Sequence, residues 1–322
     1  MVIQNKNIKI IFNRLVGPVL FVWLSYTTYQ QMLQQPHLHR SLQHIKTVAY
    51  GSGAWKFLLV ILLMGMNWLA EAYKWKILMA PVERVSLLRS FKAVIAGVAF
   101  GMGTPNRIGE FGGRAFYMSE GKRGSALSLT VIGSLGQLLI TLFFGSIGIF
   151  IIQLEFPGWS AGASVCIVIT TLLFFCLYFR LEWIVRIAKA CRLPEKFIRP
   201  WSVIKTVNVT ILLRVLALSV IRYIIFLAQY ILLLELAEVS VGWWNGFWLI
   251  SILYLILALV PTMALLELGV RGKAGIWLFQ TVSANTVGIY AASIGIWMIN
   301  LALPALIGSW VVLRYKFFNV KR

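Results

Sequence analysis

The sequence predicts an all-α protein: a polytopic bundle of transmembrane helices with about eight crossings and two broken or re-entrant elements. Hydrophobic residues make up 60% of the 322 residues, which is more than a soluble domain can bury. Several apolar windows approach the roughly 20 residues that a helix needs to cross a bilayer. A five-residue pattern, Glu-apolar-Gly-x-Arg, occurs at 110–114 and again at 267–271. Such charges beside a helix break at membrane depth indicate a functional cavity.

Seven apolar windows have about the length of a membrane span. In chain order they are about 11–33, 55–73, 125–152, 161–179, 211–234, 243–260 and 286–313. In the first, Lys6, Lys9 and Arg14 precede an apolar run from Leu15 to Leu24, which resembles a secretory signal. No small-residue cleavage site follows it, so an uncleaved span is expected. No polar stretch is long enough for a soluble domain, so residues 1–322 are predicted to form one integral membrane domain.

Two shorter apolar pieces, about 91–104 and 274–282, flank the two charged signatures. Each signature follows a proline by a few residues, Pro105 in one case and Pro261 in the other. Irregular backbone at membrane depth must line a cavity or meet protein. We therefore expect each piece to be half of a re-entrant or discontinuous helix, as at transporter sites. The repeated signature predicts pseudo-repeats at about 54–152 and 207–315.

Lysine and arginine predict the orientation of the chain. They concentrate in the loops at 74–92 and 180–205 and in the C-terminal tail. By the positive-inside rule, both loops and both termini face the cytoplasm, in the cell (cytoplasmic or inner) membrane. Cytoplasmic termini need an even number of crossings. A crossing by 264–282 gives eight, with 91–118 dipping in and returning; alternatively, one weaker window does not span.

The charge balance excludes several function classes. The chain has 30 Lys and Arg against 10 acids, and every acid is Glu. Because the cations lie in loops between apolar spans, they predict contact with anionic lipid headgroups and not with nucleic acid. The lack of Asp excludes Asp-dependent catalysis and the Asp-x-Asp metal-binding motif of many sugar-nucleotide enzymes. Neither the three cysteines nor His37, His39 and His44 have convincing metal-site spacing, so we expect no cofactor and no enzyme activity.

The first charged signature follows a run of chain that cannot continue a helix. Residues 101–110 contain three glycines and one proline, which leave backbone N–H and C=O groups unpaired. Arg107 could clamp a phosphate through two parallel hydrogen bonds. Glu110 could hold Arg107 or Arg114, or contact a cationic headgroup. The alternative is a buried Glu–Arg pair that only fixes a helix corner.

Residues 104–110, Thr-Pro-Asn-Arg-Ile-Gly-Glu, resemble the Thr-Pro-Gly-Arg-Ile-Gly-Glu motif of the lysylphosphatidylglycerol synthase transmembrane family, also called flippase-like domain proteins. They depart from it only at Asn106. The second site resembles the family's Pro-Gly-Gly-x-Gly-x-Arg-Glu motif through Pro261, Gly269 and Arg271. Two of its glycines and its final acid are replaced here, and Glu267 supplies an acid from the other side of Gly269.

The resemblance implies an integral membrane bundle that moves a phospholipid, anionic or aminoacylated, between leaflets. Some members carry a cytosolic aminoacyl-transferase domain, which we expect to be absent because this chain ends soon after its last predicted span. Oligomeric state is not predicted. Together with Arg222, the two motifs define the candidate lipid-binding residues: Thr104, Pro105, Arg107, Gly109, Glu110, Arg114, Arg222, Glu267, Gly269 and Arg271.

Arg222 lies near the centre of the 211–234 window. A lone Arg there costs on the order of 3 kcal/mol on insertion scales, so we expect it to pair with Glu110, Glu267 or a lipid phosphate. Arg214 is expected to snorkel to the cytoplasmic surface. Two further interpretations concern polar residues inside or at the ends of predicted spans. Glu71 and Lys74 are interpreted as a helix-end ion pair, while Gln137 and Asn300 either bridge helices or line the path.

The sequence is compatible with three functions. The favoured one is a phospholipid translocator whose polar groove shields the headgroup while the acyl chains stay in lipid. The alternatives are a glycosyltransferase-like membrane enzyme acting on a lipid carrier, and a structural or regulatory membrane protein that transports nothing.

Overall fold

The computed structural model describes residues 53–153, 161–192, 194–260 and 264–313, together with Tyr26 and Gly51. In this part of the chain all regular secondary structure is helical and there is no strand, which confirms the all-α prediction. The predicted span at 11–33, the three histidines, Pro261 and the basic C-terminal tail lie outside the described residues.

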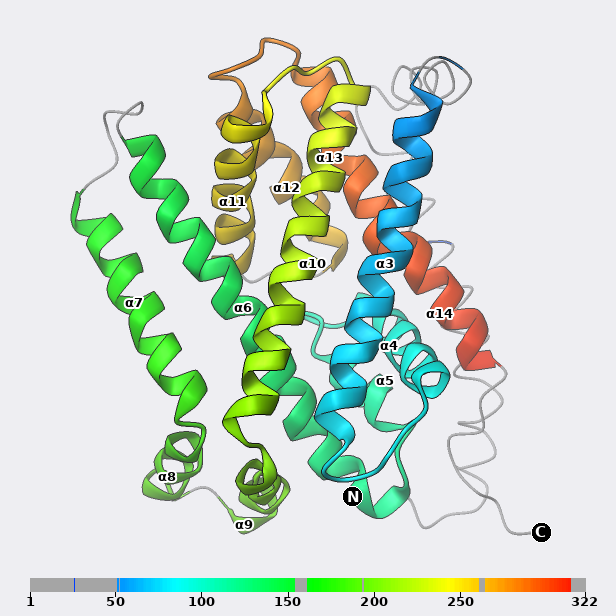
Figure 1. The fold of residues 1–322 in the computed structure, drawn as a ribbon, viewed down its shortest axis with the longest axis vertical. Helices are drawn as coiled ribbons and strands as arrows, with labels where there is room; N and C mark the ends of the chain where they lie inside the picture. The colour runs from blue at the N-terminus through cyan, green and yellow to red at the C-terminus, as the bar shows by residue number, and fades with distance from the viewer. Residues whose placement is uncertain are drawn as a thin grey trace.

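Among the described residues, four helical stretches are long and apolar enough to cross a membrane. They are α3 (Ala54–Met79), α6 (Arg123–Gln153), α10 (Val209–Leu236) and the continuous run Thr286–Leu313, made of α13 (Thr286–Trp297), the π-helical η3 (Met298–Ala302) and α14 (Leu303–Leu313). At 1.5 Å per residue each exceeds the roughly 30 Å hydrocarbon core. Figure 1 shows α3 and α10 side by side and antiparallel. Helices therefore lie where spans were predicted at 55–73, 125–152, 211–234 and 286–313.

Two helical hairpins enter the bundle from opposite ends (Figure 1). The first is α4 (Leu87–Met102) followed by α5 (Gly109–Ala115), and the second is α11 (Trp243–Leu259) followed by α12 (Ala264–Phe279). The longest of these helices, α11, has 17 residues, which extend about 25 Å and stop short of a full crossing. The first hairpin matches the expected dip at 91–118. The second differs from the expected full spans at 243–260 and 264–282, so eight crossings are not confirmed.

The remaining helices lie at one side and one end of the bundle. α7 (Ala161–Phe179) packs on α6 along the edge of the molecule, and it occupies the window predicted at 161–179. The basic connection that follows forms α8 (Glu182–Ala190), α9 (Glu195–Ile198) and η2 (Arg199–Thr206). A single 3₁₀ turn, η1 (Glu120–Lys122), precedes α6. Figure 1 places α8 and α9 at the end where α3 finishes and α6 begins.

Local sequence signals explain where several helices begin. Three helices are preceded by a residue whose side chain accepts a hydrogen bond from a backbone N–H of the first turn: Ser86, Asn208 and Asn285. Such capping satisfies donors that have no partner inside the helix. Gly308 allows α14 to approach α4 closely, because a Cβ there would collide with the backbone carbonyl of Ile95.

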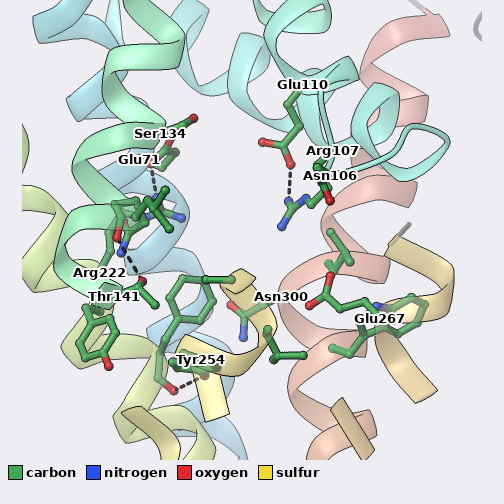
Figure 2. Close-up of a pocket in the computed structure, with 18 of the residues that line it drawn as sticks. Glu71, Asn106, Arg107, Glu110, Ser134, Thr141, Arg222, Tyr254, Glu267 and Asn300 are labelled. Atoms are coloured by element: carbon green, nitrogen blue, oxygen red, sulfur yellow. Dashed lines mark hydrogen bonds and ion pairs between the residues drawn. The ribbon is translucent and has the colours of Figure 1, made fainter. Parts of the chain in front are cut away.

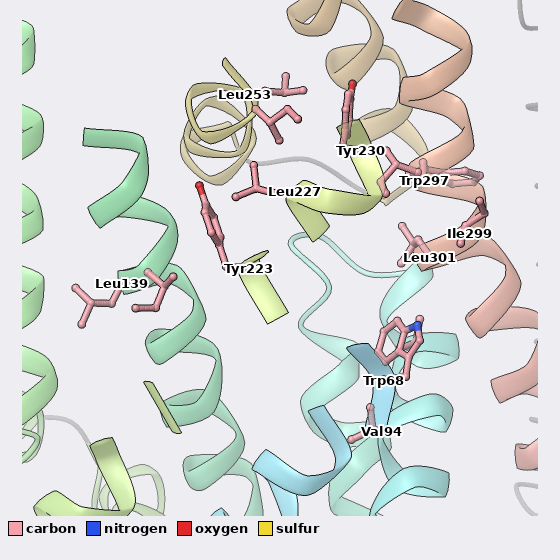
Figure 3. Packing of buried hydrophobic residues seen from close by; sticks show 14 of the residues in the cluster. Trp68, Val94, Leu139, Tyr223, Leu227, Tyr230, Leu253, Trp297, Ile299 and Leu301 are labelled. Carbon is pink, nitrogen blue, oxygen red and sulfur yellow. The ribbon is translucent and has the colours of Figure 1, made fainter. Parts of the chain in front are cut away.

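The apolar core runs along α10, as Figure 3 shows. Tyr223, Leu227 and Tyr230 of α10 pack among Leu253 of α11 and Trp297 of α13. Other large apolar side chains point outward, where a soluble protein would place polar ones. The exposed ones on α3 and α7 include Leu58, Leu62, Met66, Leu172 and Leu173. This outward apolar surface fits a protein surrounded by lipid.

The order of elements is similar in the two halves of the described chain. A long helix, two hairpin helices and a second long stretch run from α3 to α6 and again from α10 to α14. The packing partners also correspond, because α4 packs on α14 while α11 packs on α6.

Candidate functional site

A cavity of about 510 Å³ lies in the bundle between α3, α6, α10, η3 and the tips of both hairpins. Figure 2 shows charged side chains facing it from opposite walls, with Glu71 and Arg222 on one side and Arg107 and Glu267 on the other. Its volume lies within the range of small-molecule sites. In the part of the chain that the structure describes, eight charged residues line it: Glu71, Lys74, Arg107, Glu110, Arg114, Arg222, Glu267 and Arg271.

The turn between α4 and α5 is held together by Thr104. Its hydroxyl donates a hydrogen bond to the Gly101 carbonyl at 3.1 Å and accepts one from the Gly109 backbone N–H at 2.8 Å. Gly109 leaves no room for a side chain, because a Cβ there would collide with the carbonyl of Phe100. Thr104, Pro105 and Gly109 therefore shape the hairpin tip and do not line the cavity.

Two consecutive residues at this tip have left-handed backbone conformations. Asn106 has φ 48° and Arg107 has φ 59°. Asparagine is among the few non-glycine residues that adopt this region readily, which explains how it can stand at a position where the resembled motif has glycine. An arginine there is less usual and costs on the order of 1 kcal/mol. This backbone directs both side chains into the cavity lining.

Glycines of α4 make room for the charged face of α5. A Cβ at Gly97 would lie 2.7 Å from Cγ of Arg114, and a Cβ at Gly101 would lie 2.5 Å from Cγ of Glu110. Four-residue spacing places both glycines on one face of α4, and the same spacing places Glu110 and Arg114 on one face of α5. Glu110 pairs with Arg107 and, through Oε2, accepts a hydrogen bond from Nη2 of Arg114 at 3.1 Å.

Glu71 of α3 lies at the centre of a group of three cations. Its Oε1 is 2.5 Å from Nη1 of Arg114, and its Oε2 is 2.7 Å from Nζ of Lys74 and also pairs with Arg222. These four residues, here named the Glu71 cluster, are between 2% and 8% exposed. Arg222 therefore pairs with Glu71. The partners that we predicted for it, Glu110 and Glu267, contribute no direct ion pair in the described structure.

A chain of amide hydrogen bonds continues from Arg222 into the bundle. Its Nε donates to Oδ1 of Asn67 at 2.9 Å, and Nδ2 of Asn67 lies 3.5 Å from Oδ1 of Asn300. Asn300 then donates to Gln229 at 3.1 Å, and Gln229 donates to the Val60 carbonyl at 2.8 Å. Asn300 lies in the π-helical η3, a feature that is frequent at functional sites. Asn300 both bridges helices and lines the cavity.

Gln137 of α6 also both lines the cavity and bridges helices, the two roles that the sequence left open. It lines the cavity, its Oε1 accepts from Arg222 at 3.3 Å, and its Nε2 donates to the Ser219 carbonyl at 3.3 Å. Arg214, by contrast, is exposed and does not line the cavity, as expected for a snorkelling side chain.

The second signature contributes one ion pair from a single helix. Oε1 of Glu267 is 2.5 Å from Nη2 of Arg271, and the Arg271 guanidinium lies 5.8 Å from the ring centre of Tyr254. Gly269 is exposed and has open space where a Cβ would be. The two signatures therefore face one cavity through their Glu and Arg residues and not through the glycine between them.

Six of the predicted site residues meet in the cavity, and four do not line it. Those that meet are Arg107, Glu110, Arg114, Arg222, Glu267 and Arg271. The predicted Glu71–Lys74 ion pair is confirmed at 2.7 Å. Sequence reasoning missed that this pair is buried in the site. One signal could have shown it: Asn67, Glu71 and Lys74 are four and three residues apart, which places three polar side chains on one face of an apolar helix.

Comparison with known proteins agrees with this architecture. A family model described as the lysylphosphatidylglycerol synthase TM region matches residues 14–308. No curated protein matches the chain. The family match covers most of the 322 residues, including both hairpins and all of the charged residues that line the cavity. The chain is a multi-pass membrane protein that belongs to the lysylphosphatidylglycerol synthase transmembrane family.

Proposed function

We propose that this protein translocates a phospholipid, whose polar headgroup occupies the central cavity while its acyl chains stay in the surrounding lipid. The observation that carries the proposal is the gathering of eight charged side chains in one cavity between two hairpin tips. Ionisable residues inside a membrane bundle are rare and mark substrate or ion pathways, among other functional sites. Broken helical elements that meet near the middle of a bundle are typical of transporter sites.

The arginines of the cavity are proposed to bind the lipid phosphate. A guanidinium offers two parallel donors that match phosphate oxygens. The Arg107 side chain is 35% exposed, so it is the arginine of the first signature best placed to meet an entering headgroup. Glu110 and Glu267 would hold these cations when the cavity is empty, or contact a cationic headgroup. We assign Thr104, Pro105 and Gly109 the role of shaping the tip that presents Arg107.

We further propose that residues of about 54–152 and 207–315 are inverted repeats. The antiparallel arrangement of α3 and α10 supports this, as does the entry of the two hairpins from opposite ends (Figure 1). In transporters with inverted repeats, one repeat rocks against the other so that the site opens to each side in turn. This relation would let one cavity serve both leaflets.

The orientation that we propose places the α8–α9 end in the cytoplasm of the cell membrane, with both termini on that side. Lys and Arg are concentrated in the described connections at this end, including Arg84, Lys122 and Arg186. The opposite end has Glu235, Glu238 and the tryptophans at the start of α11. Basic loops on the inside and aromatic anchors at the interface are the usual pattern.

The test is a translocation assay on the purified protein in vesicles. A fluorescent phospholipid is loaded in both leaflets, and dithionite quenches only the outer one, so translocation appears as extra quenching. Arg107→Ala is expected to slow translocation about tenfold or more, because a charge-assisted contact contributes about 1.5–3 kcal/mol. Arg186→Ala on α8, whose side chain is 75% exposed, is the matched control. Equal rates for wild type, Arg107→Ala and Glu110→Ala would reject this site.

A further inference from the structure

The cavity has more positive than negative charge. Among the described residues that line it, five are cationic and three are carboxylates, a formal excess of two positive charges. Arg107–Glu110 and Arg271–Glu267 are neutral pairs. Glu110 also contacts Arg114 at 3.1 Å, but Arg107 is its nearer partner. When Glu110 is counted with Arg107, the excess lies in the Glu71 cluster, where Lys74, Arg114 and Arg222 surround the carboxylate of Glu71.

Neutral groups surround these cations but do not cancel their charge. Arg222 donates to the amide oxygens of Asn67 and Gln137, and Lys74 lies 3.4 Å from the Gly133 carbonyl. The three cations are at most 8% exposed, so bulk water does little to screen them. Buried charges are normally paired with an opposite charge. Among the described residues, two positive charges of this cluster therefore have no carboxylate to balance them.

Several donors at the cavity are also without an acceptor. Nε of Arg107, Arg114 and Arg271 and the indole N–H of Trp68 are buried and make no hydrogen bond in the described structure. All four residues line the cavity. A ligand that brings negative charge together with several acceptor oxygens would satisfy both the charge and these donors.

Resting on the function proposed above, we propose that the cavity selects a phosphate monoester, the headgroup of a phosphatidic acid-type lipid. Such a group carries about −1.5 to −2 charge at pH 7 and has three terminal acceptor oxygens. A phosphodiester headgroup with one negative charge would leave one cation of the Glu71 cluster uncompensated. An aminoacylated headgroup with a net positive charge would add to the excess. The charge of the cluster therefore favours the monoester over both.

The binding test uses the purified full chain in detergent and short-chain dioctanoyl lipids. Apparent affinity is measured from thermal stabilisation as each ligand is titrated. We expect dioctanoyl phosphatidic acid to bind at least about tenfold more tightly than dioctanoyl phosphatidylglycerol or its lysyl derivative. Soluble glycerol 3-phosphate supplies the same phosphate without acyl chains, and we expect it to bind more weakly than the lipid. Equal affinities for phosphatidic acid and phosphatidylglycerol would overturn the inference, and so would glycerol 3-phosphate binding as tightly as the lipid.

Charge variants make the test specific to the cluster. Lys74→Met removes one positive charge, and Gln137→Glu adds one negative charge beside Arg222 with almost no change in shape. Each should reduce the preference for phosphatidic acid over phosphatidylglycerol at least about threefold, whereas Lys74→Arg should retain it. Lys76→Met is the matched control, because Lys76 lies on the same helix but does not line the cavity. An unchanged preference in both Lys74→Met and Gln137→Glu would refute the assignment to this cluster.

The translocation assay separates the two proposals. If phosphatidic acid binds selectively but no lipid crosses the bilayer, the translocator function fails and the selectivity stands. If phosphatidic acid and phosphatidylglycerol bind equally and both cross, the selectivity fails and the translocator stands.

Discussion

Glu71 is predicted to be the residue whose charge stabilises the bundle most. Glu71→Gln keeps the size of the side chain but removes the negative charge between Lys74, Arg114 and Arg222. Arg114 would still pair with Glu110 at 3.1 Å. Lys74 and Arg222 would therefore be the cations that lose their carboxylate partner. Breaking a buried ion pair costs about 3–5 kcal/mol, because it leaves a buried charge uncompensated. No void is created, so we expect a loss of about 3–5 kcal/mol in the free energy of unfolding, out of the roughly 5–15 kcal/mol typical of folded proteins.

The assay is equilibrium unfolding in mixed micelles, with the variant and wild type compared at the same detergent composition. Glu182→Gln is the matched control: it makes the same chemical change in the exposed pair with Arg186, whose atoms are 3.8 Å apart. An exposed pair contributes at most about 1 kcal/mol. If Glu71→Gln unfolds at the same midpoint as Glu182→Gln, the cluster does not stabilise the bundle as reasoned. Recovery of stability in Glu71→Gln with Lys74→Met would support charge imbalance as the cause.

Two further predictions concern the first hairpin and the turn that precedes it. Gly97→Ala should destabilise the protein by about 1–3 kcal/mol in the same unfolding assay, because the added methyl would lie 2.7 Å from Cγ of Arg114. Gly112→Ala is the control, because a Cβ at Gly112 would have no heavy atom within 4 Å. The second concerns Glu83, between α3 and α4. Burial alone would raise the pKa of this carboxyl, but hydrogen bonds from Ser119 and the charge of Arg89 outweigh burial and lower the pKa. The ionised Glu83 carboxylate should therefore stabilise the folded protein above about pH 4.5, and this stabilisation should be lost as the pH falls through the lowered pKa. When the free energy of unfolding is measured against pH, Glu83→Gln should not show this loss. A Glu83→Gln variant with the pH dependence of wild type would contradict this.

Much of the fold could be predicted because its signals are local. Long apolar windows predicted the four long helices, and the glycines and proline at 101–105 predicted the first reversal. The second reversal gave a weaker signal, since α11 is largely apolar and only Pro261 follows it, with no glycine-rich end comparable to that of α4. Its 17 residues are close to the length of a span, so composition alone could not show that the chain turns back.

The site was predictable only in part because its contacts join distant segments. The Glu110–Arg114 and Glu267–Arg271 pairs lie within single helices, so spacing along the chain indicates them. Arg222 and Glu71 are 151 positions apart, and no local pattern pairs them. Their contact follows from the packing of α10 against α3.

Arg114 touches carboxylates on two elements, Glu110 in its own helix and Glu71 in α3. The α4–α5 hairpin is thereby tied to the long helices at membrane depth, and sliding it along α3 would separate opposite charges where few solvent dipoles can replace them. Arg271 and Glu267 belong to one helix. The α11–α12 hairpin can shift against α3 and α10 without separating any ion pair among the described cavity residues. Two segments with the same five-residue signature therefore differ in how they are held: an ion pair ties the first to α3, whereas the described ion pair of the second lies within one helix.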